Sequence, residues 1–289
     1  MSRHWTALPN FVDCEVFKPI AGGRQAIRAN LGIPEDAFVI GCVAAVKKHH
    51  KRIDYLINEF ARLSNDGKTR TNIDRQDRQD RNLDPIIPKP SCISCPSMLN
   101  PYLLIAGAKT DETPELLALA ESLIPGRYKI MTDCSRAQMP DLLRSMDVFV
   151  LTSLFEMMPI ALLEALATGL PCVVNAHPVL EWMTGVEEEK SIEQKETKEK
   201  KGEGLVSAFG GGRNSSLFPS FPSVQTSSAG GEAIDMRQEG SLAAALGGLT
   251  PEWLAHHGRQ ARERAVAMFS TEAVIGEYVK YYGEVMSEE

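Results

Sequence analysis

The chain has 289 residues, of which 43% are hydrophobic, so it can bury the core of one large domain or two small ones. The net charge of −7 and the absence of a clear basic patch argue against nucleic acid as a partner. No signal-peptide pattern opens the sequence, and the most apolar run, 148–174, contains two glutamates and two prolines. We therefore expect a cytoplasmic protein without a transmembrane segment.

The first part of the chain predicts an extended segment, a helix and a buried strand. Residues 8–20 are irregular, residues 22–31 have helical spacing, and residues 38–44 form an apolar run of strand length. Continuous apolar runs of this kind are typical of strands that are buried in parallel sheets. We interpret 1–37 as a segment leading into one domain that spans 38–289.

Six consecutive basic or imidazole side chains follow this strand, at positions 47–52, and an amphipathic helix comes next. They place positive charge at the carboxyl end of the strand. Such a cluster is either a solvated loop or a clamp for an anion such as a diphosphate. His49 and His50 are interpreted as loop residues, because no other histidine or cysteine stands at metal-ligand spacing.

Two stretches interrupt the pattern of strands and helices. Residues 65–99 repeat Asp-Arg-Gln before becoming proline-rich, and residues 187–229 pass from a Glu/Lys mixture to Gly-, Ser- and Pro-rich sequence. Such composition buries too little apolar surface to become ordered, so both are predicted to be disordered insertions. The pair Cys92 and Cys95 in the first stretch is weak support for a metal or redox site, and the scattered remaining cysteines suit reduced thiols.

Strands and helices alternate through the rest of the chain. Further strands are predicted near residues 102, 128, 148, 171 and 232, and three helices close the chain at 240–248, 251–268 and 271–286, the last with Ser270 as its N-cap. This alternation predicts an α/β fold with a doubly wound, parallel Rossmann-like sheet of about six strands in the order 3-2-1-4-5-6. Strands 1 and 4 are neighbours in that order, so the basic cluster and residues 153–156 should meet in one crevice, where such folds bind ligands.

The segment FEMMPIALLEALATGLP, 155–171, predicts a buried helix between two strands. Pro159 suits the first turn of that helix, and Gly169 suits the left-handed position just past its end. Glu164 lies among apolar residues, where a carboxylate is costly unless it is paired or hydrogen-bonded. Its donors are either a ligand's pair of hydroxyl groups or an internal arginine or backbone group. Glu156 lies before the helix, at the positive end of the helix dipole, where anions bind.

Glu156 and Glu164 form an E-x7-E pattern, and FEMMPIALLEALATGLPCVV resembles the donor-site segment of retaining GT-B glycosyltransferases, family 4 (group 1). The resemblance implies that Glu164 holds the ribose hydroxyls of a nucleotide-sugar. It also implies that Glu156, the expected catalytic residue, lies beside the transferred sugar. Recognition of the base is expected near residues 127–134.

The same resemblance implies the contacts to the rest of the donor. Lys51 matches a lysine that the family places before the amphipathic helix after the basic cluster, and Lys47 substitutes for an arginine that has no clear counterpart here. Met158 and Pro159 stand where the family usually has Phe-Gly; proline has no N–H, which predicts that one backbone contact to the donor is missing. The expected donor-binding set also includes Met157 and Ile160.

The family transfers a hexose from a nucleoside diphosphate sugar without a metal or other cofactor, so the resemblance implies this reaction with an unknown acceptor. Its members carry an acceptor-binding domain ahead of a segment like residues 8–20, so we expect a single GT-B half that needs a separate N-terminal acceptor domain. The last helix would cross towards that domain and leave Tyr278, Tyr281 and Tyr282 partly exposed. A non-catalytic nucleotide-sugar-binding or interaction module, and a nucleotide-sugar epimerase of the same fold, remain alternatives.

Overall fold

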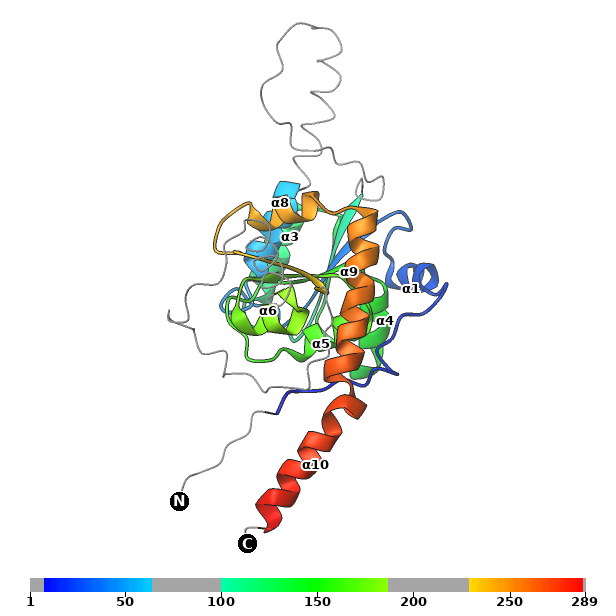
Figure 1. Cartoon of the computed structure of the whole chain (residues 1–289). Coiled ribbons are helices and arrows are strands. Elements are labelled where there is room, and N and C mark those ends of the chain that lie inside the picture. The colour runs from blue at the N-terminus through cyan, green and yellow to red at the C-terminus, as the bar shows by residue number, and fades with distance from the viewer. Residues whose placement is uncertain (1–7, 64–99, 187–228, 288–289) are drawn as a thin grey trace, which may run out of the picture.

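The computed structural model describes residues 8–63, 100–186 and 229–287. The two predicted insertions, 65–99 and 187–229, lie outside the described residues apart from Ala229, and so do Cys92 and Cys95. The described residues form a parallel sheet with helices on both faces (Figure 1).

The sheet has six strands in the order β3-β2-β1-β4-β5-β6, and every neighbouring pair is parallel. The predicted doubly wound, Rossmann-like sheet is therefore confirmed. The order reverses between β1 and β4, where Ile40 pairs with Val148 and Gly41 with Phe149. The strands are β1 (Phe38–Val43), β2 (Pro101–Ala106), β3 (Tyr128–Met131), β4 (Val148–Leu151), β5 (Cys172–Asn175) and β6 (Gly231–Ile234).

Successive side chains of each strand alternate between two buried cores, because residues of a strand point to opposite faces of the sheet. Val39 and Phe149 pack into one core, and Ile40 and Val148 pack into the other. The first core is covered by the segment before β1, which includes α1 (Arg24–Leu31), and by α4 (Met139–Arg144), α5 (Ile160–Ala167), α6 (Pro178–Thr184) and α9 (Pro251–Arg264). The second is covered by the helix at 53–63, α3 (Thr113–Leu123) and α8 (Ser241–Gly247).

The chain segments that leave β1 and β2 run very close together. The amide of Ala44 donates to the carbonyl of Ala106, and the amide of Val46 donates to the carbonyl of Ala108, both at 2.9 Å. A Cβ atom at Gly107 would lie 1.7 Å from the carbonyl oxygen of Ala44, so only glycine fits there. The loop after β1 therefore starts from a fixed position.

The last helix, α10 (Thr271–Ser287), extends away from the sheet (Figure 1). Ser270 is confirmed as its N-cap, because its Oγ accepts a hydrogen bond from the amide of Ala273 at 3.1 Å. The hydroxyl of Tyr278 donates to the carbonyl of Pro9 at 2.9 Å, so Tyr278 is partly covered by the N-terminal segment, while Tyr282 is exposed. No helix in the described ranges combines the length and the apolar character that a membrane span requires.

Candidate functional site

The basic loop between β1 and the helix at 53–63 has a strained backbone. His50 and Arg52 have φ angles of 73° and 53°, in the left-handed region that side chains other than glycine rarely adopt. Thr152, just after β4, donates from its Oγ1 to the carbonyl of Lys51 at 2.7 Å. The end of β4 therefore holds Lys51 in place, and strain of this kind is frequent at ligand-binding sites.

Lys51 and Glu156 lie together, as the strand order predicts. The ammonium group of Lys51 forms an ion pair with Oε1 of Glu156, and Nε2 of His50 lies 4.0 Å from the same oxygen. Glu156 is only 9% exposed, so its carboxylate needs a close positive charge or hydrogen-bond donors. The loops after β1 and β4 therefore bring a cation and a carboxylate to one point.

The remaining lysines of the basic cluster point in different directions. Lys48 is bound to α3, since its amide donates to Oε2 of Glu112 at 2.6 Å and its ammonium group pairs with Glu115. Lys47 is half-buried and forms no ion pair with another described residue. Of the two lysines predicted to bind the donor, Lys51 is engaged with Glu156, and Lys47 remains available to an anion.

Helix α5 begins one residue later than predicted. Pro159 is its N-cap, with φ −70° and ψ 119°, and does not lie in its first turn, because that ψ angle is extended. The carbonyl of Pro159 accepts from the amide of Leu162 at 3.1 Å and starts the helix. Gly169 has the predicted left-handed conformation, with φ 77°.

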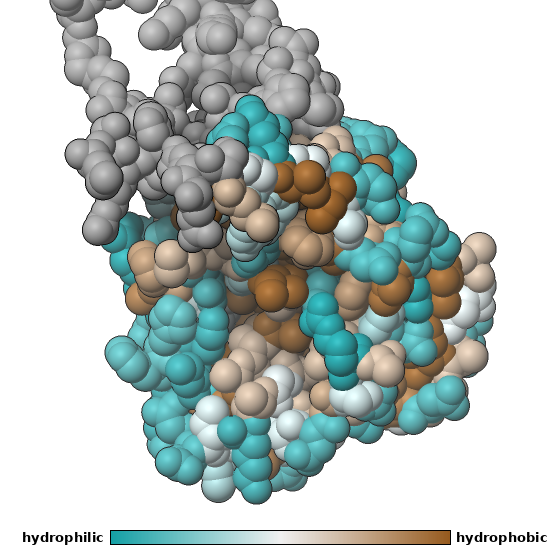
Figure 2. Space-filling view, turned by 90° about the horizontal axis from the view of Figure 1, so that it is seen from below, coloured by the Kyte–Doolittle hydropathy of each residue, from teal (hydrophilic) through white to brown (hydrophobic). Residues whose placement is uncertain are grey.

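The loop that leads into α5 exposes apolar side chains. Phe155 is 58% exposed and Met157 is 80% exposed, and Leu154 and Ile160 are also exposed. Met158 is half-buried, and its carbonyl accepts a hydrogen bond from Nδ2 of Asn10 at 3.0 Å. Figure 2 shows apolar side chains near the centre of the lower face of the molecule, between hydrophilic ones.

Glu164 is buried, as predicted, with 2% exposure. Nη1 of Arg136 lies 2.5 Å from its Oε1, yet no donor among the described residues meets hydrogen-bond geometry at that oxygen. Burial raises the pKa of Glu164, and the positive charge of Arg136 opposes this rise. An arginine partner was one of the alternatives that the sequence left open, but this arginine is 69% exposed and is not internal.

Some buried polar atoms on the chain around β4, α5 and β5 have no hydrogen-bond partner among the described residues. In the described part of the chain they are Ser153 Oγ, Glu164 Oε1 and His177 Nδ1. Ser153 follows β4, His177 follows β5, and Glu164 lies on the helix that joins these two strands. Buried polar groups in proteins are normally hydrogen-bonded, so each of these atoms can accept or donate a bond when a ligand or water is present.

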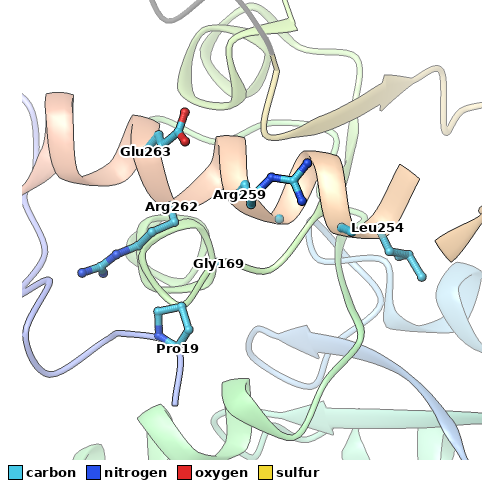
Figure 3. A pocket seen from close by; sticks show the side chains of 8 residues that line it. Pro19, Gly169, Leu254, Arg259, Arg262 and Glu263 are labelled. Carbon is cyan, nitrogen blue, oxygen red and sulfur yellow. The ribbon is translucent and has the colours of Figure 1, made fainter. Parts of the chain in front are cut away.

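A depression of about 370 Å³ lies elsewhere, against α9 (Figure 3). Arg262, which lines it, donates from Nη1 to three backbone carbonyls and so connects α9 to the N-terminal segment and to α5. None of the predicted donor-site residues lines it. Its lining consists of Pro19, Gly169, Leu254, Ala255, Gly258, Arg259, Arg262 and Glu263.

The described residues give little support for a metal site or a reactive cysteine. They contain no group of three or more His, Cys, Asp or Glu side chains suited to a metal ion. Cys14, Cys42, Cys134 and Cys172 are free thiols, and complete burial raises the pKa of Cys42 to about 12. A thiol with so high a pKa stays protonated and is a poor nucleophile.

Several residues around this site are not predictable from the sequence pattern. Arg136 is the most important of them, and Thr152 and His177 were not singled out as site residues either. The Ser-x-x-Gln pattern at Ser135–Gln138 is a capping box, which predicts a helical turn beginning at Arg136. That pattern indicates where the backbone of Arg136 lies, but it does not indicate that the side chain reaches Glu164.

Comparison with known proteins relates part of the chain, including the E-x7-E segment, to a known family. Residues 96–200 match the model of the family described as glycosyl transferases group 1. The predicted resemblance to group 1 glycosyltransferases is confirmed. Two curated relatives match parts of the chain: UDP-Gal:alpha-D-GlcNAc-diphosphoundecaprenol alpha-1,3-galactosyltransferase of Escherichia coli is 58% identical over 40 residues, and the putative glycosyltransferase EpsF of Bacillus subtilis (strain 168) is 28% identical over 171 residues. These alignments cover 14% and 58% of this chain but only 10% and 35% of the relatives.

Several solved structures share the fold. Sucrose-phosphate synthase from Thermosynechococcus elongatus has a TM-score of 0.64 at 18% identity, and the Anabaena protein HepE, in complex with UDP and glucose, has 0.61 at 14%. These matches cover 98% and 96% of this chain but 53% and 57% of those chains, so it spans about half their length. The C-terminal domain of a group 1 family protein from Francisella tularensis matches over 90% of this chain and 98% of its own length, with 13% identity and a TM-score of 0.54. The described residues thus share the fold of that C-terminal domain.

Proposed function

We propose that the crevice at the carboxyl ends of β1 and β4 binds a nucleoside diphosphate sugar. The chain is then the donor-binding half of a retaining, family 4 GT-B glycosyltransferase that transfers a hexose. The observation that carries this proposal is the meeting of Lys51 and Glu156 in front of α5, with the buried Glu164 further along the same helix. The UDP and glucose named with HepE support a nucleotide-sugar as the ligand class.

The diphosphate is held by positive charge from two sources. Lys51 and Lys47 supply ammonium groups, and the start of α5 supplies backbone N–H groups that have no partner inside the helix. In the free protein Lys51 pairs with Glu156, so the diphosphate shares this lysine with the carboxylate. Because these groups supply the charge, binding is independent of a divalent metal and needs no other cofactor.

The ribose and the sugar occupy the two sides of the diphosphate. Glu164 accepts hydrogen bonds from the ribose hydroxyls, which are better-oriented donors to its buried Oε1 than Arg136 is. Glu156 lies beside the sugar, and Met157, Met158 and Ile160 contact the donor. Residues 127–134, which include β3, lie near the base.

In the reaction, the bond between the anomeric carbon and the diphosphate oxygen breaks, and a bond from that carbon to an acceptor hydroxyl oxygen forms on the same face of the sugar. The acceptor's proton leaves with the diphosphate or passes to water. Lys51 and the helix dipole stabilise the charge that develops on the diphosphate. The acceptor binds to a separate N-terminal acceptor domain, and the reaction takes place in the cytoplasm.

Calorimetric titration with UDP, GDP and ADP tests this site. Hydrogen bonds to a charged group contribute about 1.5–3 kcal/mol each, so Glu164→Gln should weaken the best ligand about ten- to a hundredfold. Lys51→Ala removes a charge pair that is open to water and contributes about 1 kcal/mol, so it should weaken the same ligand about fivefold. Lys18→Ala removes an exposed lysine that pairs with Glu15, and should change nothing. EDTA should leave the affinity unchanged. If Glu164→Gln and Lys51→Ala both bind nucleotides like the wild type, the proposed location of the donor site is wrong.

A further inference from the structure

Arg136 has a fixed backbone and an exposed side chain. It opens the 3₁₀ turn Arg136–Gln138 after β3, and the amide of Ser135 donates to Oε1 of Gln138 at 2.8 Å, which fixes the start of this turn. The guanidinium carbon lies 5.5 Å from the centre of the buried Phe17 ring. From this position the side chain reaches across to the buried Glu164.

The contact between Arg136 and Glu164 satisfies the carboxylate incompletely. Nη1 of Arg136 lies 2.5 Å from Oε1 of Glu164, but this buried oxygen receives no well-oriented hydrogen bond from the described residues. The guanidinium is mostly in water, where the attraction of an ion pair is screened. Hydroxyl groups that enter from a ligand can direct their hydrogens at the same oxygen and exclude water from it.

We propose that Arg136 is a displaceable counter-ion. Its guanidinium pairs with the Glu164 carboxylate in the free protein and moves away from it when the ribose of a nucleotide binds. This inference rests on the proposed donor site and assigns a positioning role to a residue outside the E-x7-E segment. The guanidinium and the ribose hydroxyls compete for one carboxylate oxygen. Arg136 therefore keeps the empty site charged and oriented, and it lowers the affinity for ribonucleotides.

Removal of the competitor should tighten binding. The variant Arg136→Gln keeps most of the side-chain volume without the charge, and it should raise the affinity for the best of UDP, GDP and ADP about two- to fivefold, the range of a screened ion pair. The gain should vanish in the Glu164→Gln background. It should also vanish with the 2′,3′-dideoxy form of the same nucleotide, because that ligand has no hydroxyls to donate to Glu164.

A pH profile separates this role from simple support of the fold. Burial raises the pKa of Glu164, and Arg136 opposes the rise. Without Arg136 the pKa rises further, so the loss of affinity on acidification should begin at a higher pH in Arg136→Gln than in the wild type. Arg62→Gln is the matched control, because Arg62 is also an exposed arginine, 49% accessible, and pairs with Glu239 at 2.5 Å on the helix at 53–63. Its affinity and pH profile should equal those of the wild type.

The experiment is calorimetry of all five proteins, wild type included, over a pH series, with circular dichroism to confirm folding. A gain that depends on both Glu164 and the ribose hydroxyls supports the inference. Unchanged or weaker binding by a folded Arg136→Gln protein, alongside a large loss in Glu164→Gln, overturns the inference and leaves the proposed function intact. Failure of every nucleotide to bind the wild type overturns both.

Discussion

Glu164 shows how, at the scale of a single residue, a binding function opposes stability. A carboxylate with 2% exposure and no well-formed hydrogen bond in the described structure is costly to keep charged. Burial accordingly raises its pKa despite the nearby Arg136. A residue that costs stability in the free protein is well suited to gain from a ligand that supplies the missing donors.

Glu164→Gln should therefore make the free protein more stable at neutral pH. A carboxyl whose pKa is raised in the folded state contributes stability below its unfolded pKa of about 4.3, and this stability is lost as the pH rises through the folded pKa. Glutamine does not titrate, so the advantage of the variant should be largest near pH 7 and shrink towards about pH 4. Thermal unfolding of both proteins across this range is the measurement. A variant less stable than the wild type at pH 7 would show that Glu164 is a structural anchor.

The sequence predicted the positions of the site's carboxylates better than it predicted their partners. Glu164 was expected to be buried because its helix is apolar nearly all round, and the meeting of Lys51 and Glu156 followed from the strand order. The reach of Arg136 to Glu164 was not predicted. It depends on how the turn after β3 and the N-terminal segment, with Phe17, pack together, and no local pattern encodes that packing.

At the scale of elements, the close approach of the chain after β1 and β2 positions the basic loop. Gly107→Ala should destabilise the protein by about 1–3 kcal/mol, the usual effect of overpacking, because the new Cβ would overlap the carbonyl of Ala44. It should also weaken nucleotide binding, since displaced backbone at Ala44 moves the loop that carries Lys51.

The control for this change is Gly276→Ala on α10, where a Cβ meets no atom within 4 Å. Alanine is a better helix former than glycine, so this variant should be unchanged or more stable by up to about 1 kcal/mol. Chemical denaturation of both variants measures the two effects. Equal stability of the two would mean that the loop after β1 tolerates displacement and does not depend on Gly107.

The elements themselves were largely predictable because the four central strands, β1, β2, β4 and β5, are short apolar runs bounded by turn residues. The predictions were wrong at some ends of the helices. Helix α9 was expected to continue to 268, but it gives way at Arg264 to a π-helical turn, Ala265–Phe269. Arg264 is fully buried and donates to the carbonyls of Trp182 and Met183, a long-range contact that sequence periodicity does not reveal.

At the scale of the whole molecule, the loop before α5 lacks a covering wall in the described residues. Phe155 and Met157 are exposed beside Glu156, so a bound diphosphate would face water. A charge pair in water contributes only about 1 kcal/mol, whereas enzymatic rate enhancement requires about 8 kcal/mol or more. We expect this chain alone to bind the donor without transferring sugar.

An assay with radiolabelled nucleotide-sugars and a mixture of acceptors tests this expectation. Transfer should appear only when a separately expressed N-terminal acceptor domain is added. Wild type and Glu156→Gln should be compared with that domain present, since only the former should be active. Robust transfer by the chain alone would contradict the requirement for a second domain.

The central claim is that the carboxyl ends of β1 and β4 form a nucleotide-sugar site, and a crystal structure with the tightest-binding nucleoside diphosphate tests it most directly. The account predicts the diphosphate between Lys51 and the start of α5, the ribose hydroxyls on Glu164, and Arg136 turned away from that carboxylate. A nucleotide bound instead in the depression between Pro19 and Arg259, with the Lys51–Glu156 and Arg136–Glu164 pairs undisturbed, would contradict it.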